Sequence, residues 1–512
     1  MNKKARLATL TLAAVMLTGV AAGCSSSKNE GNKGTSSEPA SSASASPASA
    51  TKDPYEIAIA VPVFGAVPKD LPAVQEEISK IAQAKMNTTV KIIPVSIGAW
   101  GQQMNLMTSG REKLDLFFEF GQGYSADVAA GKIIPLDDLL NQYGEGIKNQ
   151  IAPEYLNSAK INGKIYGAPV YKDYTTGVPG VLMRKDLVDK YQIDVASIKT
   201  IDDLDQVYET IKKNEPTIVP LGAGLTLPSD KYVWYDKLGD RYGVLPGYDN
   251  DLKVVNLFET KEYEDYLNKM HSWAKAGYFN KDAATSQVGG FELLKADKAF
   301  SYFIGLKPGN LESETRAAGK ELVFVPLMSD IYATTSDTLG GLWTISSNSS
   351  NPERVMMFMN LMYTDKDIAN LFIFGIEGKD YVKVTDTSID YPEGVDSKTV
   401  GYSFQSWMYA NPSIAYLMKS DHQEMWKLTA EANQNAIKSK ALGFAFNSEP
   451  VKNEITALKN VTDQYVKGLE TGTFDPADKL PEFRAKLKAA GIDKVIAEKQ
   501  KQLDAWAAAN QK

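Results

Sequence analysis

The single cysteine, Cys24, is the residue whose surroundings most clearly predict covalent chemistry. Three basic residues precede an apolar run from Leu7 to Val20, which is short for a bilayer span. Small residues stand directly before the cysteine, as in a lipoprotein signal covering residues 1–23. The sulfur of such a cysteine receives a diacylglycerol, whose two acyl chains give a stable membrane anchor. The alternative is an ordinary signal peptide followed by an incidental cysteine.

Little else in the chain predicts metal binding or catalysis. The two histidines, His271 and His422, are far apart, and no cluster has the ligand spacing of a zinc site. No phosphate-binding glycine loop and no Gly-x-Ser-x-Gly nucleophile elbow occurs in the sequence. The run 249–251 (Asp-Asn-Asp) lacks the Gly and Glu of a calcium loop, so it predicts a turn. We therefore expect no metal and no cofactor.

Composition separates a polar N-terminal segment from the folded part. Residues 24–53 are mostly Ser, Ala, Gly, Lys, Asn, Thr and Pro, which predicts a disordered linker between the membrane and the folded part. The rest of the chain is too long for one ordinary core and predicts two lobes. The net charge of −7, more negative once the basic leader is removed, argues against nucleic acid as a partner.

The N-terminal half of the folded part alternates strands with helices. Strands are expected at 55–61, 90–95 and 114–118, with helices at 71–85 and 100–109 between them. This order predicts a parallel sheet with crossover helices. Ligands bind such sheets at the carboxyl ends of the strands, so the loops after the first and third strands are candidate site loops.

The chain is expected to leave one lobe, build a second and return. Lobe 1 is predicted at 54–170 and about 340–375, where a strand re-enters its sheet. Lobe 2 is predicted at about 180–330 and about 380–512, and includes a helical C-terminal extension. The extension is predicted to end in one amphipathic helix from 481 to 506. Several crossings between two lobes are typical of a hinge.

Three stretches resemble the extracellular solute-binding proteins of carbohydrate ABC importers. They are Tyr166–Tyr171 with Arg184–Leu187, then Trp273–Tyr278 with Asp282, then Asn351–Arg354 with Asn360–Asp365 and Gly375–Tyr381. The third is the most specific and is similar to the LplA-type lipoprotein branch, whose C-terminal extension also resembles residues 445–503.

The resemblance implies an α/β fold with two lobes, a periplasmic-binding-protein-like (type II) clamshell with a helical C-terminal extension. It also implies a membrane-anchored receptor on the extracellular face of the cell membrane. Such a receptor captures a carbohydrate, here expected to be an oligosaccharide, and delivers it to the permease subunits of an ABC transporter. It would act as a monomer and break no bond.

Candidate ligand residues follow from the chemistry of sugars, which present apolar C–H faces and rims of hydroxyls. Aromatic rings suit the faces, and amides or carboxylates suit pairs of hydroxyls. Residues of these types at predicted cleft positions are Phe64 after the first strand, Phe120, Gln122 and Tyr124 after the third, Tyr171, Asp173 and Tyr174 in the crossing, Trp343 after two glycines, and Trp234, Trp407 and Glu377.

These candidates also have structural interpretations. Four aromatic candidates could be core residues instead: Phe64, Trp234, Trp343 and Trp407. Three further tryptophans lie in helical patterns and are expected to pack: Trp273, Trp426 and Trp506. Asp173 and Glu377 could hold the hinge through hydrogen bonds to the backbone.

Two other functions are open at this point. An anchored polysaccharide-degrading enzyme would need two carboxylates across the cleft, for which Asp173 and Glu377 are the nominal pair. Nothing else in the sequence indicates catalysis. The same fold could also bind a peptide or act as a sensor for a membrane kinase, and the sequence does not separate this alternative from transport.

Overall fold

The computed structural model describes residues 51–110, 112–247, 250–328 and 330–510. The predicted signal peptide, Cys24 and nearly all of the predicted linker lie outside these residues.

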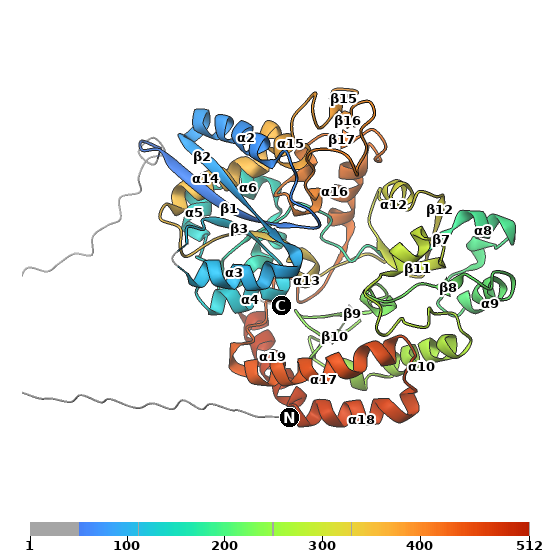
Figure 1. The fold of residues 1–512 in the computed structure, drawn as a ribbon. Helices are drawn as coiled ribbons and strands as arrows, with labels where there is room; N and C mark the ends of the chain where they lie inside the picture. Colours follow the sequence, from blue (N-terminus) through green and yellow to red (C-terminus); the bar gives the residue numbers. More distant parts are fainter. Residues whose placement is uncertain (1–50, 111, 248–249, 329, 511–512) are drawn as a thin grey trace, which may run out of the picture. The chain divides into compact units, whose positions relative to one another are not determined.

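Lobe 1 is built on a five-stranded sheet with the order β2-β1-β3-β14-β6 (Figure 1). The strands are β1 (Tyr55–Val63), β2 (Thr88–Ser96), β3 (Leu116–Glu119), β6 (Ala168–Pro169) and β14 (Leu342–Ile345). β1 is parallel to both β2 and β3, whereas β14 is antiparallel to β3 and β6. The predicted parallel sheet and the returning strand are therefore confirmed. β1, which lies between β2 and β3, is buried on both faces because its residues 57–62 are all apolar.

Helices surround this sheet. They are α2 (Leu71–Met86), α3 (Trp100–Ser109), α4 (Gly121–Ala129), α5 (Asp137–Tyr143), α6 (Glu145–Gln150), α14 (Pro352–Thr364) and α15 (Lys366–Phe374). The start of α14 is set locally, because the side chain of Asn351 accepts a hydrogen bond from the backbone N–H of Arg354 and Pro352 occupies the first turn.

Lobe 2 has a mixed sheet with the order β12-β7-β11-β8. Its main elements are β7 (Val178–Arg184), α9 (Leu204–Asn214), β8 (Val219–Leu221), α10 (Lys261–Lys275), α11 (Gly290–Lys295), β11 (Ala299–Leu306), α12 (Leu311–Ala318) and β12 (Leu322–Pro326). α9 and α10 contribute their apolar faces to the large core of this lobe. α11 and α12 contact β11 and β12 and enclose a smaller core.

Shorter elements complete the two lobes. They are α7 (Pro153–Leu156), β4 (Lys160–Ile161), β5 (Lys164–Ile165), α8 (Lys185–Lys190), β9 (Tyr235–Asp236), β10 (Leu245–Pro246), α13 (Thr335–Thr338), β15 (Val382–Lys383), β16 (Ser388–Asp390) and β17 (Leu417–Met418).

The C-terminal extension follows α16 (Met425–Asn435) and consists of α17 (Lys452–Glu470), α18 (Pro476–Ala489) and α19 (Ile492–Ala509). The prediction of one helix over 481–506 is wrong. Gly491 adopts a φ of +95°, a left-handed conformation that glycine reaches without strain, and the chain turns there between two helices. The buried faces of all three helices belong to the core of lobe 2.

Part of the segment assigned to lobe 2 packs elsewhere. The sequence placed everything after about residue 380 in lobe 2, but Tyr402, Met408 and Tyr409 are buried in the core of lobe 1. The physical reason is apolar burial against α15, where the hydroxyl of Tyr402 donates to the carbonyl of Phe372 at 2.9 Å. We propose that the remaining predicted boundaries describe the lobes correctly.

Three chain segments cross between the lobes side by side. β13 (Tyr332–Ala333) pairs in parallel with β18 (Ile437–Lys438) and forms an antiparallel bridge with Thr175. The N–H of Thr176 donates to the carbonyl of Tyr332 at 2.8 Å, which continues this pairing. The crossings therefore form a small hydrogen-bonded ribbon at the predicted hinge.

Candidate ligand-binding site

A pocket of about 670 Å³ lies beside the three crossings and is lined from both lobes. Lobe 1 contributes Phe120, Tyr124 and Ser125, from the end of β3 and the start of α4. Lobe 2, its extension and the crossings contribute most of the remaining wall: Asp230, Lys231, Tyr235, Lys237, Asp240, Lys307, Thr334, Thr335, Ser336, Asp337, Phe444 and Phe446. We call this cavity the central pocket.

The central pocket is suited to a neutral ligand with many hydroxyl groups. Its lining includes three lysines and three aspartates, so the fixed charges balance, together with several side-chain hydroxyls. Aromatic rings complete the wall. Carboxylates, ammonium groups and hydroxyls can each bond sugar hydroxyls, whereas a strongly charged ligand would find no complementary excess of charge.

Three aromatic side chains form what we call the aromatic platform: Phe64, Phe120 and Trp407. Phe64 directly follows β1, Phe120 directly follows β3, and Trp407 lies in a short 3₁₀ turn at Ser406–Met408. The ring centroid of Trp407 lies 6.0 Å from that of Phe64 and 6.5 Å from that of Phe120. Phe64 is 47% exposed and Trp407 is 43% exposed, so two large rings present apolar area to solvent. Adjacent exposed rings of this size offer an apolar surface to a ligand, and Phe120 also lines the central pocket.

Trp343 lies behind the platform instead of on it. Its side chain is 0% exposed, and its indole N–H donates to the carbonyl of Met408 at 3.0 Å. The ring packs edge-on against Phe118, 5.9 Å away between centroids. These contacts match the structural interpretation of Trp343, and a direct contact with ligand stays a prediction.

Tyr124 reaches the central pocket but is nearly buried. Its hydroxyl donates to the carbonyl of Ala159 at 2.5 Å and accepts from the N–H of Tyr166 at 3.0 Å. Burial raises the pKa of Tyr124 well above its ordinary value, so the hydroxyl stays protonated as a donor. Gln122 lies in the first turn of α4, and its side chain is outside the described part of the structure.

Tyr171 and Tyr174 pack beside the first crossing. The ring of Tyr171 lies 6.4 Å from that of Tyr174 and 6.2 Å from that of Trp426. Tyr174 is buried, with its ring 4.4 Å from that of Tyr155. Among the described residues neither tyrosine lines the central pocket. Their role in binding is therefore a prediction that these contacts do not support.

Asp173 holds the crossing through the backbone. Its Oδ1 accepts from the N–H of Thr175 at 2.7 Å, and its Oδ2 lies 3.5 Å from Nζ of Lys307. Lys307 itself donates to the carbonyl of Thr175 and lines the central pocket. These contacts agree with the structural interpretation of Asp173, and they place a lysine of the pocket wall at the hinge.

Two further candidates lie outside the lining of the central pocket as the described residues define it. Glu377 is exposed and forms an ion pair with Lys383 at 2.8 Å. Trp234 is half-buried, with its ring 5.3 Å from that of Tyr235, a residue of the pocket wall. Their contact with ligand remains predicted.

Most of the wall contributed by lobe 2 and the crossings was not predicted from the sequence. One local signal was available at Thr334, whose hydroxyl oxygen accepts from the N–H of Asp337 at 3.2 Å at the start of α13. This spacing of Thr and Asp is typical of a helix N-terminus. No comparable local pattern marks Lys231, Lys237 or Lys307, which come together only through the fold.

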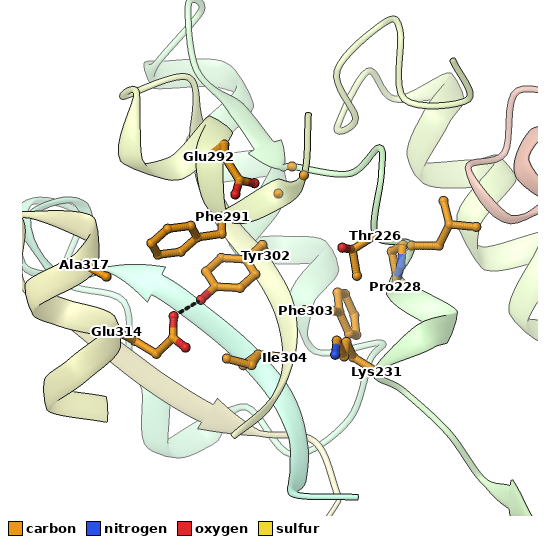
Figure 2. A pocket seen from close by; sticks show the side chains of 14 residues that line it. Thr226, Pro228, Lys231, Phe291, Glu292, Tyr302, Phe303, Ile304, Glu314 and Ala317 are labelled. Atoms are coloured by element: carbon orange, nitrogen blue, oxygen red, sulfur yellow. Dashed lines mark hydrogen bonds between the residues drawn. The ribbon is translucent and has the colours of Figure 1, made fainter. Parts of the chain in front are cut away.

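A smaller pocket of about 380 Å³ lies within lobe 2 and shares Lys231 with the central pocket (Figure 2). The rings of Phe291 and Tyr302 meet there with centroids 5.9 Å apart. The hydroxyl of Tyr302 donates to Glu314 at 2.9 Å, and burial raises the pKa of that carboxyl group. The two pockets are neighbours in lobe 2, with Lys231 in the wall of each.

Over the described ranges, no group of three or more His, Cys, Asp or Glu residues is placed to hold a metal ion. In the same part of the chain, no helix combines the length and apolarity that crossing a membrane requires.

Comparisons with known proteins agree with this architecture. A family model described as bacterial extracellular solute-binding protein matches residues 66–369, more than half of the chain. A second model, described as a domain of unknown function (DUF3502), matches residues 440–508. The chain is 28% identical over 447 residues to a carbohydrate ABC transporter substrate-binding protein of Streptococcus pneumoniae serotype 4, covering 86% of this chain and 89% of that protein.

Solved structures show the same likeness. The N-glycan transport solute binding protein (NgtS) of Streptococcus pneumoniae has a TM-score of 0.80 and 28% identity, with 90% of this chain and 100% of that chain covered. The structure of that protein in complex with Man5GlcNAc has a TM-score of 0.72 and 28% identity at the same coverage.

Proposed function

The chain belongs to the family of bacterial extracellular solute-binding proteins, and we propose that it captures an oligosaccharide between its lobes and delivers it to an ABC permease. Proteins of this family bind solutes and are not enzymes. The relatives described as carbohydrate-binding and N-glycan-binding proteins support an oligosaccharide as the ligand class.

The aromatic platform beside the central pocket is the observation that carries this proposal. Exposed rings such as Trp407 can stack on the apolar faces of sugar rings, with Phe64 and Phe120 extending the surface. Hydroxyl, carboxylate and ammonium groups of the adjoining pocket can then bond the sugar hydroxyls. A ligand that touches both lobes favours their closure, because it gains contacts that the open arrangement lacks.

The site of action follows from the N-terminal sequence. We propose that Cys24 carries a lipid and that residues 24–53 tether the folded part to the extracellular face of the cell membrane. The tethered monomer would then release its sugar to the permease subunits in the same membrane. Labelling of the full chain with a radioactive fatty acid, lost in Cys24→Ala, tests the anchor.

A thermal-shift panel tests the ligand class. The chain from Ser46 to Lys512 forms one compact unit and is the protein to use. Ligand at a hundredfold excess over its dissociation constant should add about 2.7 kcal/mol of stability. We expect a clear rise in Tm with oligosaccharides containing mannose and N-acetylglucosamine. A rise with peptides alone would reject this function in favour of peptide binding or sensing.

A further inference from the structure

A second cavity of about 850 Å³ lies between lobe 1 and the C-terminal extension. One side of it is lined by the β4–β5 hairpin, by α7 and by the turn after α7. The other side is lined by α19 and by the segment before α17. Its lining includes Asn157, Lys160, Asn162, Phe444, Gln502 and Trp506. We call this cavity the extension pocket.

An aromatic pair forms part of its wall. The ring centroids of Phe444 and Trp506 lie 6.0 Å apart with an interplanar angle of 64°. Within α19, Leu503 and Ala507 are buried in the protein, while Trp506 is only half-buried and faces the cavity. Gly443 has a φ of +99°, and an added Cβ there would lie 3.4 Å from the ring of Trp506. The turn at Gly443 thus brings the chain close against this ring.

The extension holds this wall in place. The side chain of Gln502 accepts from the N–H of Asn447 and donates to its carbonyl, both at 2.9 Å. Lys438 and Glu154, which both line the cavity, form an ion pair at 2.7 Å. The opposite side presents the amides of Asn157 and Asn162. An aromatic wall facing amides is the combination that sugar binding requires.

One chain segment, residues 444–448, borders both the extension pocket and the central pocket. Phe444 and Ala445 line both cavities, Phe446 and Ser448 line the central pocket, and Asn447 lines the extension pocket. The segment 444–448 therefore contributes side chains to the walls of both cavities. The two cavities are therefore neighbours that share the residues Phe444 and Ala445 in their walls.

We propose that the C-terminal extension carries a second saccharide subsite, in which Trp506 and Phe444 hold an outer unit of an oligosaccharide whose other end occupies the central pocket. This inference rests on the proposed function and specifies the size of the ligand. With two subsites, the site selects long or branched oligosaccharides. It also gives a role to the region that matches the domain of unknown function, since residues 440–508 contain both rings.

Calorimetric titration with two probes tests the inference. The probes are a mannose–N-acetylglucosamine disaccharide and Man5GlcNAc, each titrated into the unit Ser46–Lys512. We expect Trp506→Ala to weaken Man5GlcNAc about tenfold or more and to leave the disaccharide unchanged, because an aromatic anchor contributes at that scale. Trp506→Phe should retain most of the affinity. Trp407→Ala, on the aromatic platform, is the matched control and should weaken both probes.

A second variant covers the case in which Trp506→Ala does not fold. Asn157→Ala changes an exposed side chain on the opposite wall and should lower Man5GlcNAc affinity about threefold, with no change in Tm. The inference would be overturned if Trp506→Ala weakened both probes equally or weakened neither. The proposed function would still stand in that case if Trp407→Ala weakened both probes. The inference would also be overturned for this sugar class if the unaltered chain bound neither probe. The thermal-shift panel would then test the proposed function independently with other ligands.

Discussion

The indole N–H of Trp343 donates a hydrogen bond of 3.0 Å to the backbone carbonyl of Met408, the residue after Trp407. Phe118 packs edge-on against both tryptophan rings, with centroids 5.9 Å from Trp343 and 6.1 Å from Trp407. The fully buried Trp343 thus holds in place the segment that carries the exposed Trp407. We infer that Trp407 contacts the ligand and that Trp343 positions it.

Replacing the exposed ring should affect binding and not folding. Trp407→Ala is expected to weaken oligosaccharide binding by about 1–3 kcal/mol, because it removes an aromatic stacking surface. Its Tm should stay close to that of the unaltered chain, since 43% of the side chain is already exposed. Isothermal titration and a thermal melt on the same sample measure both quantities. The control Val384→Ala changes another exposed apolar residue, which lines no described pocket, and should alter neither.

The buried partner should behave differently. Trp343→Phe removes the donor to the carbonyl of Met408 and part of the packed volume, so it is expected to cost about 1–3 kcal/mol of unfolding free energy. Urea titration measures this loss. Affinity should fall as well, because the segment carrying Trp407 loses its support. A variant with unchanged stability but reduced affinity would show instead that Trp343 contacts the ligand itself.

Glu119 should make stability depend on pH. It lies buried at the end of β3, directly before Phe120, and burial with the nearby charge of Asp127 raises its pKa well above the ordinary range. The folded state therefore holds the proton more tightly than the unfolded state. Protonated Glu119 therefore contributes its full share of stability below about pH 4.3, the pKa of an unfolded glutamate. This contribution is lost as the pH rises through the raised pKa of Glu119 in the folded state.

Unfolding free energies across that pH range test the assignment. Glu119→Gln cannot ionise, so its stability should match that of the unaltered chain in acid and exceed it increasingly as pH rises. A constant difference between the two proteins at all pH values would show that another group titrates.

A buried carboxylate should fasten the C-terminal extension to lobe 2. Glu470, at the end of α17, is fully buried and accepts from Tyr263 at 2.8 Å, while Ser229 and Arg241 also bond it. Glu470→Ala leaves the half-buried Arg241 without its carboxylate partner and should cost about 3–5 kcal/mol. Glu482→Gln, which alters exposed ion pairs of α18, should change stability far less. Similar losses in both variants, measured in urea, would contradict this role.

The regular elements could be predicted because their signals are local. Strands β1, β2 and β3 and helices α2 and α3 follow directly from runs and spacings of apolar residues, and their observed ends differ from the expected ones by a few residues at most. The break at Gly491 also had a local signal, a glycine between two apolar stripes, but the long charged pattern around it favoured one helix.

The site could be predicted only in part because exposure and assembly are not local properties. Trp343 and Trp407 looked equivalent in the sequence, yet the fold buries the first completely and leaves the second exposed. Lys231 and Lys307 reach the central pocket from separate parts of lobe 2, and Phe444 reaches it from the extension. Such convergence depends on how distant segments pack, which residue types and spacing do not encode.

Isothermal titration of the unit Ser46–Lys512 with a long mannose-containing oligosaccharide shows whether the protein binds a saccharide at all. We predict saturable binding of one ligand per chain, weakened in Trp407→Ala and unchanged in Val384→Ala. Absence of heat with every oligosaccharide tried, or binding that is indifferent to Trp407→Ala, would contradict the account of the aromatic platform and the central pocket as a saccharide site.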